Sequence, residues 1–161
     1  MTTTAPAVTR IEPDPALLDE LDELDAFDAD YADAFRLQAR PREDARTWAA
    51  AALRGAEARG GLFATLVWRG VLGLRVARVG TACTVAGWRV AFETPERVVL
   101  AAGGGRMSGR MVFDIDDVGL TWTTMLVFHR PPARLTWQVA GGAHRALVPR
   151  CLLAAERALG A

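Results

Sequence analysis

Residues 107–128 read MSGRMVFDIDDVGLTWTTMLVF and contain two runs in which apolar and polar side chains alternate. In the first run Met107, Met111, Phe113 and Ile115 fall at odd positions, and in the second Leu120, Trp122, Leu126 and Phe128 fall at even positions. A period of two is typical of a strand that buries one face. The two runs therefore predict an antiparallel hairpin that turns at Asp116-Asp117.

Further strands precede this hairpin. Residues 88–93 alternate in the same way, and residues 98–100 form another apolar run after a turn. The three glycines at 103–105 then turn the chain into the hairpin. Four strands joined by tight turns predict an antiparallel meander. Residues 31–38 also alternate, with Tyr31 on the apolar face, and predict a fifth strand.

The C-terminal part predicts one long helix. Pro131-Pro132 ends the sheet, and apolar side chains then recur in steps of three and four. These positions are Trp137, Ala140, His144, Val148, Cys151, Ala155 and Leu159. A curved sheet and a long helix each need an apolar partner, and each is the obvious partner of the other. The fold class expected is α+β, with a curved antiparallel sheet gripping a long C-terminal helix.

The N-terminal part divides into two segments before a domain at residues 31–161. Residues 1–13 are rich in Thr, Ala and Pro without apolar periodicity and are expected to be disordered. Residues 14–30 predict an acidic helical segment, with Asp14 as its cap and Pro15 in its first turn. After Pro41 a helix is expected that ends at Gly60-Gly61, followed by a second short helix over residues 62–72.

Charge is segregated along the chain although the net charge is zero. Residues 1–35 hold ten acidic side chains and one arginine, a net charge of −9, and the remainder carries +9. Leu17, Leu21 and Leu24 share one face of the acidic helix, and this apolar face has to be buried against another surface. We therefore predict that this segment docks on an arginine-bearing surface of its own domain or of a neighbour. An uncontacted acidic tail is the alternative.

Absent residue types exclude several classes of function. The chain has no lysine, so a side-chain Schiff base and a phosphate-binding P-loop are excluded. Its 19 basic residues are all arginine, which points to a GC-rich bacterial genome. They are scattered singly and not in runs, so no nucleic-acid partner is expected. The most apolar stretch, residues 61–76, carries two arginines and is too short for a membrane span. A cytoplasmic protein is expected, and a homodimer is left open.

Metal and nucleophile chemistry find no supporting pattern. The histidines and the two cysteines lack the spacing of a metal site, so no metal and no cofactor are expected. Asp28, Asp30 and Asp33 lack the glycine and glutamate of a calcium loop and are interpreted as a solvated acidic linker. Ser108, the single serine, does not sit in a nucleophile elbow.

Two side chains are candidates for acid–base chemistry, although a catalytic set stays unknown. His144 lies on the apolar face of the predicted C-terminal helix, where a titratable group can contact a ligand or transfer a proton. A buried histidine satisfied by a nearby hydroxyl or carbonyl is the alternative. Tyr31, the single tyrosine, is the second candidate.

The chain resembles the START-like, or SRPBCC, superfamily, which has the helix-grip fold, and is most similar to a bacterial family of unknown function within it. The likeness covers roughly residues 31 to 159 and rests on Asp30–Phe35, Thr47-Trp48, Gly73–Arg75, Trp88, Glu93–Leu100, Thr123-Thr124 and His144-Arg145. The superfamily's sheet has more than five strands, and residues 79–85 are the expected place for another. The resemblance implies a cavity between sheet and C-terminal helix.

The expected function is binding of a hydrophobic or aromatic small molecule in that cavity, without defined catalysis. The side chains expected to line it are Trp88, Val90, Phe92, Met111, Phe113, Trp122, Phe128 and His144. One alternative is a polyketide cyclase- or aromatase-like enzyme of the same fold, with His144 or Tyr31 in acid–base roles. The other is a structural or regulatory module whose core is filled.

Overall fold

The computed structural model of the protein describes residues 6–65 and 83–160. Within these ranges the chain forms a seven-stranded sheet and three helices. The strands are β1 Val8–Ile11, β2 Tyr31–Gln38, β3 Thr84–Val85, β4 Trp88–Glu93, β5 Arg97–Gly103, β6 Met107–Asp116 and β7 Gly119–Phe128. The helices are α1 Pro15–Asp25, α2 Ala45–Thr65 and α3 Pro131–Leu159.

The sheet runs in the order β1-β2-β7-β6-β5-β4-β3, and neighbouring strands are antiparallel. The predicted hairpin is confirmed: Met107 pairs with Phe128 at its open end and Asp116 pairs with Gly119 at its turn. The meander comprises β4 to β7, and its last strand, β7, pairs with β2. Strand β4 lies near the opposite edge of the sheet from β2. The fold is α+β, with a curved antiparallel sheet and a long C-terminal helix, as expected.

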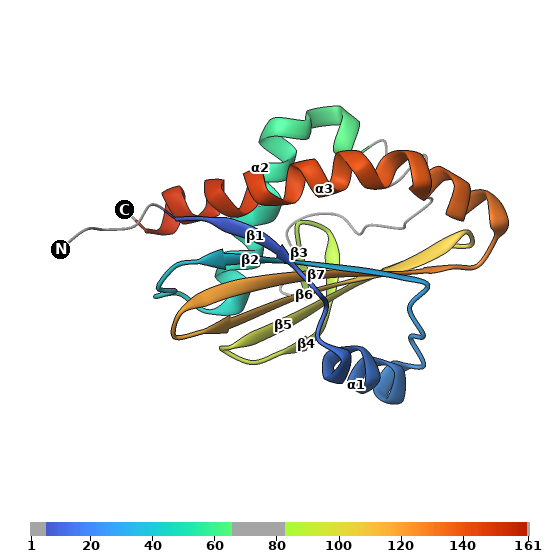
Figure 1. The fold of residues 1–161 in the computed structure, drawn as a ribbon, viewed down its shortest axis with the longest axis horizontal. Coiled ribbons are helices and arrows are strands. Elements are labelled where there is room, and N and C mark those ends of the chain that lie inside the picture. Colours follow the sequence, from blue (N-terminus) through green and yellow to red (C-terminus); the bar gives the residue numbers. More distant parts are fainter. Residues whose placement is uncertain (1–5, 66–82, 161) are drawn as a thin grey trace.

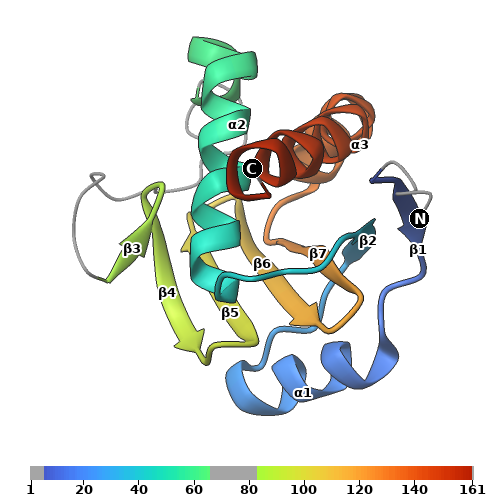
Figure 2. The same ribbon diagram turned by 90° about the vertical axis from the view of Figure 1, so that its left-hand side faces the viewer.

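The sheet is covered on both faces. Helices α2 and α3 pack together over one face, and α1 lies against the other (Figures 1 and 2). The side chains between the sheet and the α2–α3 layer form the larger core, which includes Phe35, Trp48, Phe113 and Leu152. Period-two alternation sends alternate side chains of each strand into the two cores. We call the face of the sheet that α2 and α3 cover the α3 face, and the face that α1 covers the α1 face.

The acidic segment docks on the sheet of its own chain. This is one of the two outcomes that the docking prediction allowed. Asp14 caps α1 by accepting a hydrogen bond from the Ala16 backbone N–H at 3.0 Å, and Pro15 is the first residue of the helix. Leu17 and Leu21 are buried on the α1 face, in a cluster with Val99, Val112 and Met125. The apolar face of the helix therefore holds the segment in place.

One arginine contact also joins α1 to the sheet. Arg97 donates to Glu20 at 2.9 Å and also pairs with Asp114. Both side chains of the Glu20–Arg97 pair are partly exposed, so this pair is worth about 0–1 kcal/mol. It orients the helix and adds little to the burial of the leucines.

The N-terminal boundary differs from the expectation. Val8–Ile11, expected to be disordered, forms edge strand β1 and pairs with β2 from Val8 opposite Leu37 to Ile11 opposite Ala34. Local composition gives no sign of this strand, because its stability comes from hydrogen bonds to a distant partner.

Helix α2 continues past Gly60-Gly61, so the predicted stop is wrong. A glycine in a helix interior costs about 1 kcal/mol relative to alanine, which packing can offset. Gly55 is a point of close approach to α3, since a Cβ there would lie 3.3 Å from Ala154 Cβ. Of the second helix expected at residues 62–72, residues 66–72 lie outside the described ranges. The extra strand expected at 79–85 corresponds in part to β3, Thr84–Val85.

Candidate functional site

A polar cluster lies inside the otherwise apolar core of the α3 face. Strand β2 points Tyr31, Asp33, Phe35 and Leu37 to this face by simple alternation. Asp33 is opposite Thr124 of β7 in the sheet register, and both side chains are 1% exposed. Directly paired residues place their Cβ atoms about 4.5–5.5 Å apart. Asp33 and Thr124 therefore form the floor of the cluster.

Asp33 links the two acid–base candidates. The Tyr31 hydroxyl donates to Asp33 Oδ2 at 2.5 Å. His144 Nε2 of α3 lies 3.6 Å from Asp33 Oδ1. Arg145, the next residue of α3, donates from Nη1 to the Tyr31 hydroxyl at 3.3 Å. The structure thus brings Tyr31 and His144 together through a carboxylate that the sequence analysis had assigned to a solvated linker.

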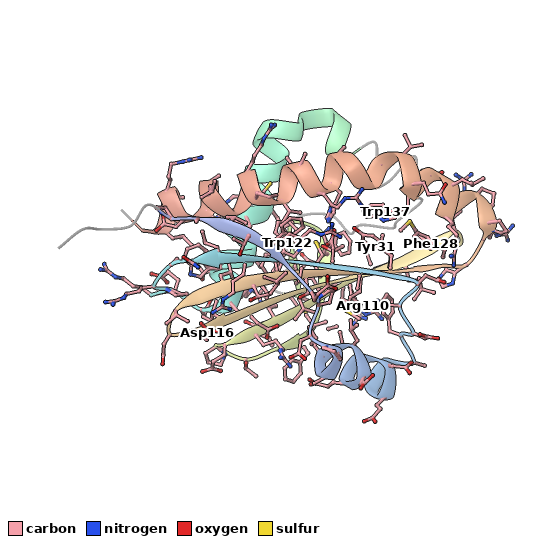
Figure 3. The ribbon with its side chains drawn as sticks, in the orientation of Figure 1. Tyr31, Arg110, Asp116, Trp122, Phe128 and Trp137 are labelled. Atoms are coloured by element: carbon pink, nitrogen blue, oxygen red, sulfur yellow. The ribbon has the colours of Figure 1, made fainter. Side chains whose placement is uncertain are left out.

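Aromatic rings lie beside both His144 and Tyr31. His144 lies 5.2 Å from Trp137 of α3 and 6.5 Å from Trp122 of β7, measured between ring centroids. Tyr31 meets Trp137 edge to face at 5.1 Å. Figure 3 shows Tyr31, Trp122 and Trp137 between the sheet and α3. The ionisable groups are therefore held among apolar ring surfaces with little water around them.

The electrostatics favour an ionised Asp33 and a protonated Tyr31. Burial disfavours the charge of Asp33, but His144, the Tyr31 hydroxyl and Arg10 outweigh it and hold the pKa of Asp33 below its usual value. Burial, together with the bond to Asp33, raises the pKa of Tyr31 above its usual value although Arg145 opposes this. Tyr31 is thus a hydrogen-bond donor to a carboxylate at neutral pH.

Several buried polar atoms of the cluster have no hydrogen-bond partner within the described residues. They are the indole nitrogens of Trp122 and Trp137, the Thr124 hydroxyl and Asp33 Oδ1. Buried polar groups in proteins are paired in the great majority of cases. Each of these atoms could hydrogen-bond to a molecule held beside it.

Most of the side chains expected to line the cavity do lie on the α3 face. Trp88, Met111, Phe113, Trp122 and His144 are buried there. Val90 and Phe128 are half-buried and pack against the same core. The polar cluster is concentrated at β2, β7 and α3, whereas Trp88 and Val90 lie on β4, three strands from β7.

Phe92 does not lie where it was expected. It is 50% exposed and lines a hollow on the α1 face with Leu17, Arg97 and Arg110. The cause is a register shift between Val90 and Phe92 in the pairing of β4 with β5. An irregularity of this kind redirects the following side chains to the other face of the sheet. Alternation extrapolated through residue 92 therefore gave the wrong face.

Two acidic residues of the expected linker are structural. Asp33 is buried, and Asp30 accepts from the Phe128 backbone N–H at 2.7 Å and from Arg134 at 2.6 Å. The sequence did indicate the burial of Asp33, because in an alternating strand it lies on the same face as Tyr31 and Phe35. Trp137 was placed on the apolar stripe of α3 but not among the cavity residues. Arg145 and Thr124 had no assigned role.

In the described part of the chain, no three His, Cys, Asp or Glu side chains gather in a way that could hold a metal ion. Cys83 is exposed and Cys151 is buried, and the two do not form a disulfide with each other. Among the described helices none is both long and apolar enough to cross a membrane.

No family model matches this chain, and no curated protein matches it. Among solved structures, the chain is similar to the crystal structure of CalU16 from Micromonospora echinospora. The sequence identity is 11% and the TM-score is 0.32, with 94% of this chain and 83% of that chain covered. A likeness at this level carries no argument about function, which has to be argued from the site itself.

Proposed function

We propose that this protein binds a small apolar or aromatic molecule between the sheet and α3, beside Asp33 and His144, as a helix-grip protein of the START-like kind. The observation that carries the proposal is the buried Asp33–His144 pair, whose imidazole ring lies beside the rings of Trp122 and Trp137. Ionisable groups enclosed by apolar and aromatic side chains are typical of functional sites. The rings supply contact area, and the polar groups supply orientation.

The stability of the protein alone does not account for this pair. Desolvating two ionisable side chains offsets most or all of their attraction, and apolar side chains of similar size often serve stability as well. A core built only to hold the sheet against α3 would be expected to place apolar residues at positions 33 and 144. This argument favours a ligand site over a filled structural core.

The experiment that tests the proposal is native mass spectrometry of freshly purified protein. We expect a bound small molecule, released on denaturation, in the wild-type protein and a reduced bound fraction in Trp122→Ala. Val139→Ser, at a side chain that is 84% exposed on α3, is the matched control and should keep the molecule. If no small molecule is retained and none of a panel of apolar compounds binds, the core is filled and the proposal fails.

An enzyme of the same fold is the second candidate, and one observation favours it. Tyr31 and His144, the two acid–base candidates, contact the two oxygens of one carboxylate. Such an arrangement can orient an imidazole and stabilise its charge while it moves a proton. The substrate in this case would be of polyketide type, undergoing cyclisation or aromatisation. Turnover should then be lost in His144→Ala while the molecule is still bound, whereas a pure binding protein has no turnover to lose.

A further inference from the structure

We infer that the molecule held beside Asp33 is uncharged and carries hydrogen-bond acceptor atoms, as an aromatic ketone does, that face the indole N–H groups of Trp122 and Trp137. This inference rests on the proposed function and adds the chemical class of the ligand.

Of the unpaired polar atoms in the cluster, the two indole nitrogens can only donate, the Thr124 hydroxyl can donate or accept, and Asp33 Oδ1 accepts. Trp122 is 3% exposed and Trp137 is 4% exposed, and neither indole nitrogen has a hydrogen-bond partner within the described residues. An indole N–H can donate and cannot accept. Only an acceptor atom can therefore satisfy it, and a pure hydrocarbon would leave both donors unpaired.

The two donors belong to one site, although they come from different layers of the fold. Trp122 belongs to the sheet, on β7, and Trp137 belongs to the covering helix α3. Each indole ring lies beside the His144 ring. The Thr124 hydroxyl, also buried without a partner in the described ranges, is two residues along β7 from Trp122. Gly141 adds to the roof: a Cβ at this position would lie 3.3 Å from the Trp137 indole nitrogen. Trp137 and the α3 backbone are thus in close contact here.

The charges of the site argue for a neutral acceptor. Asp33 carries a buried carboxylate whose Oδ2 already accepts from Tyr31, and the guanidinium of Arg145, which donates to the same Tyr31 hydroxyl, balances this charge. A carboxylate or phosphate ligand beside Asp33 would meet like-charge repulsion in a medium of low dielectric constant. The carbonyl oxygen of a ketone accepts hydrogen bonds without bringing a charge. An aromatic ketone also offers a flat ring for the surrounding tryptophans.

The test compares two probes that share one ring skeleton, 1-tetralone, which has a carbonyl, and tetralin, which lacks it. The chain has five tryptophans, so the ¹⁵N-labelled protein gives few indole N–H resonances and substitution can assign each. We expect 1-tetralone to bind at least about tenfold more tightly than tetralin. It should also move the indole proton resonances of Trp122 and Trp137 downfield.

Trp122→Phe and Trp137→Phe remove one donor each and should each reduce the preference for 1-tetralone. Trp48→Phe is the matched control, because Trp48 is also buried and its indole nitrogen also lacks a partner among the described residues, but it stands on α2, and the variant should keep the preference. Equal binding of the two probes, or a preference that survives both donor substitutions, would overturn the inference and leave the proposed function standing. Binding of neither probe would overturn the proposed function as well.

Discussion

Asp33 of β2 and His144 of α3 meet inside the core, with Asp33 Oδ1 3.6 Å from His144 Nε2. The two residues are 111 positions apart in the sequence, and only the packing of the last helix across the sheet brings them together. Tyr31 and Arg145 extend the contact on either side. The fold therefore builds a polar site where α3 packs on the sheet.

The first prediction concerns the stability that Asp33 provides. Because its folded pKa is below the unfolded value of about 3.9, its carboxylate stabilises the fold above that pH. This contribution is lost as the pH falls through the folded pKa. At pH 7, Asp33→Asn should reduce the free energy of unfolding by about 1–3 kcal/mol. Denaturant melts of both proteins between pH 7 and pH 2 measure the difference.

The difference between wild type and Asp33→Asn should shrink on acidification. Asp117→Asn serves as the control because Asp117 is exposed, and its difference from wild type should stay small across the same pH range. A difference that stays constant down to pH 2, or that grows, would show that Asp33 is not the ionised partner of His144.

The second prediction uses the single tyrosine of the chain. Burial and the hydrogen bond to Asp33 raise the pKa of Tyr31, so its phenol should ionise above about pH 10. Phenolate absorbance near 295 nm follows this ionisation, and circular dichroism checks that the protein stays folded. Asp33→Asn should shift the midpoint down. A wild-type midpoint at or below pH 10 in folded protein would rule out the Tyr31–Asp33 contact.

The third prediction is that the leucines hold α1 on the sheet and the charges do not. Leu17→Ala and Leu21→Ala should each lower the free energy of unfolding by about 2–5 kcal/mol and promote association at low salt. Asp22→Ala, on the exposed side of the same helix, should change it by no more than about 0.5 kcal/mol. Thermal melts and analytical ultracentrifugation decide between this account and an uncontacted acidic tail, for which the leucine variants would melt like wild type.

The fourth prediction separates the two faces of the sheet. Phe113 is fully buried on the α3 face, and Phe113→Ala should cost about 3–5 kcal/mol. Phe92→Ala should cost about 1 kcal/mol or less because half of that side chain is already exposed. It should also leave ligand affinity unchanged. A loss of ligand binding in Phe92→Ala would mean that the site lies on the α1 face.

Most of the fold could be predicted because its elements carry strong local patterns. The alternation in β6 and β7 and the three- and four-residue spacing in α3 each follow from burial of a single face. The elements that were missed depend on distant partners. Strand β1 is held by β2, and α2 continues past two glycines against the cost that they carry.

The candidate site was only partly predictable. His144 and Tyr31 could be found because each is a titratable side chain at an apolar position of a clear pattern. Phe92 was misplaced because a register shift in one strand leaves no trace in the alternation. Asp33 shares the alternation of β2, but its acidic neighbours suggested a solvated segment. Its contact with His144 joins β2 to α3, and no local pattern predicts which residues of two distant elements meet.

The most direct test of the account is a titration of the protein with an apolar, environment-sensitive dye such as Nile red, followed by tryptophan emission. We expect the dye to quench emission with a Kd well below the millimolar range and 1-tetralone to displace it. Val139→Ser should leave that Kd unchanged, since this exposed side chain lies outside the site. No binding below the millimolar range, or binding that is lost in Val139→Ser, would contradict a ligand site between the sheet and α3.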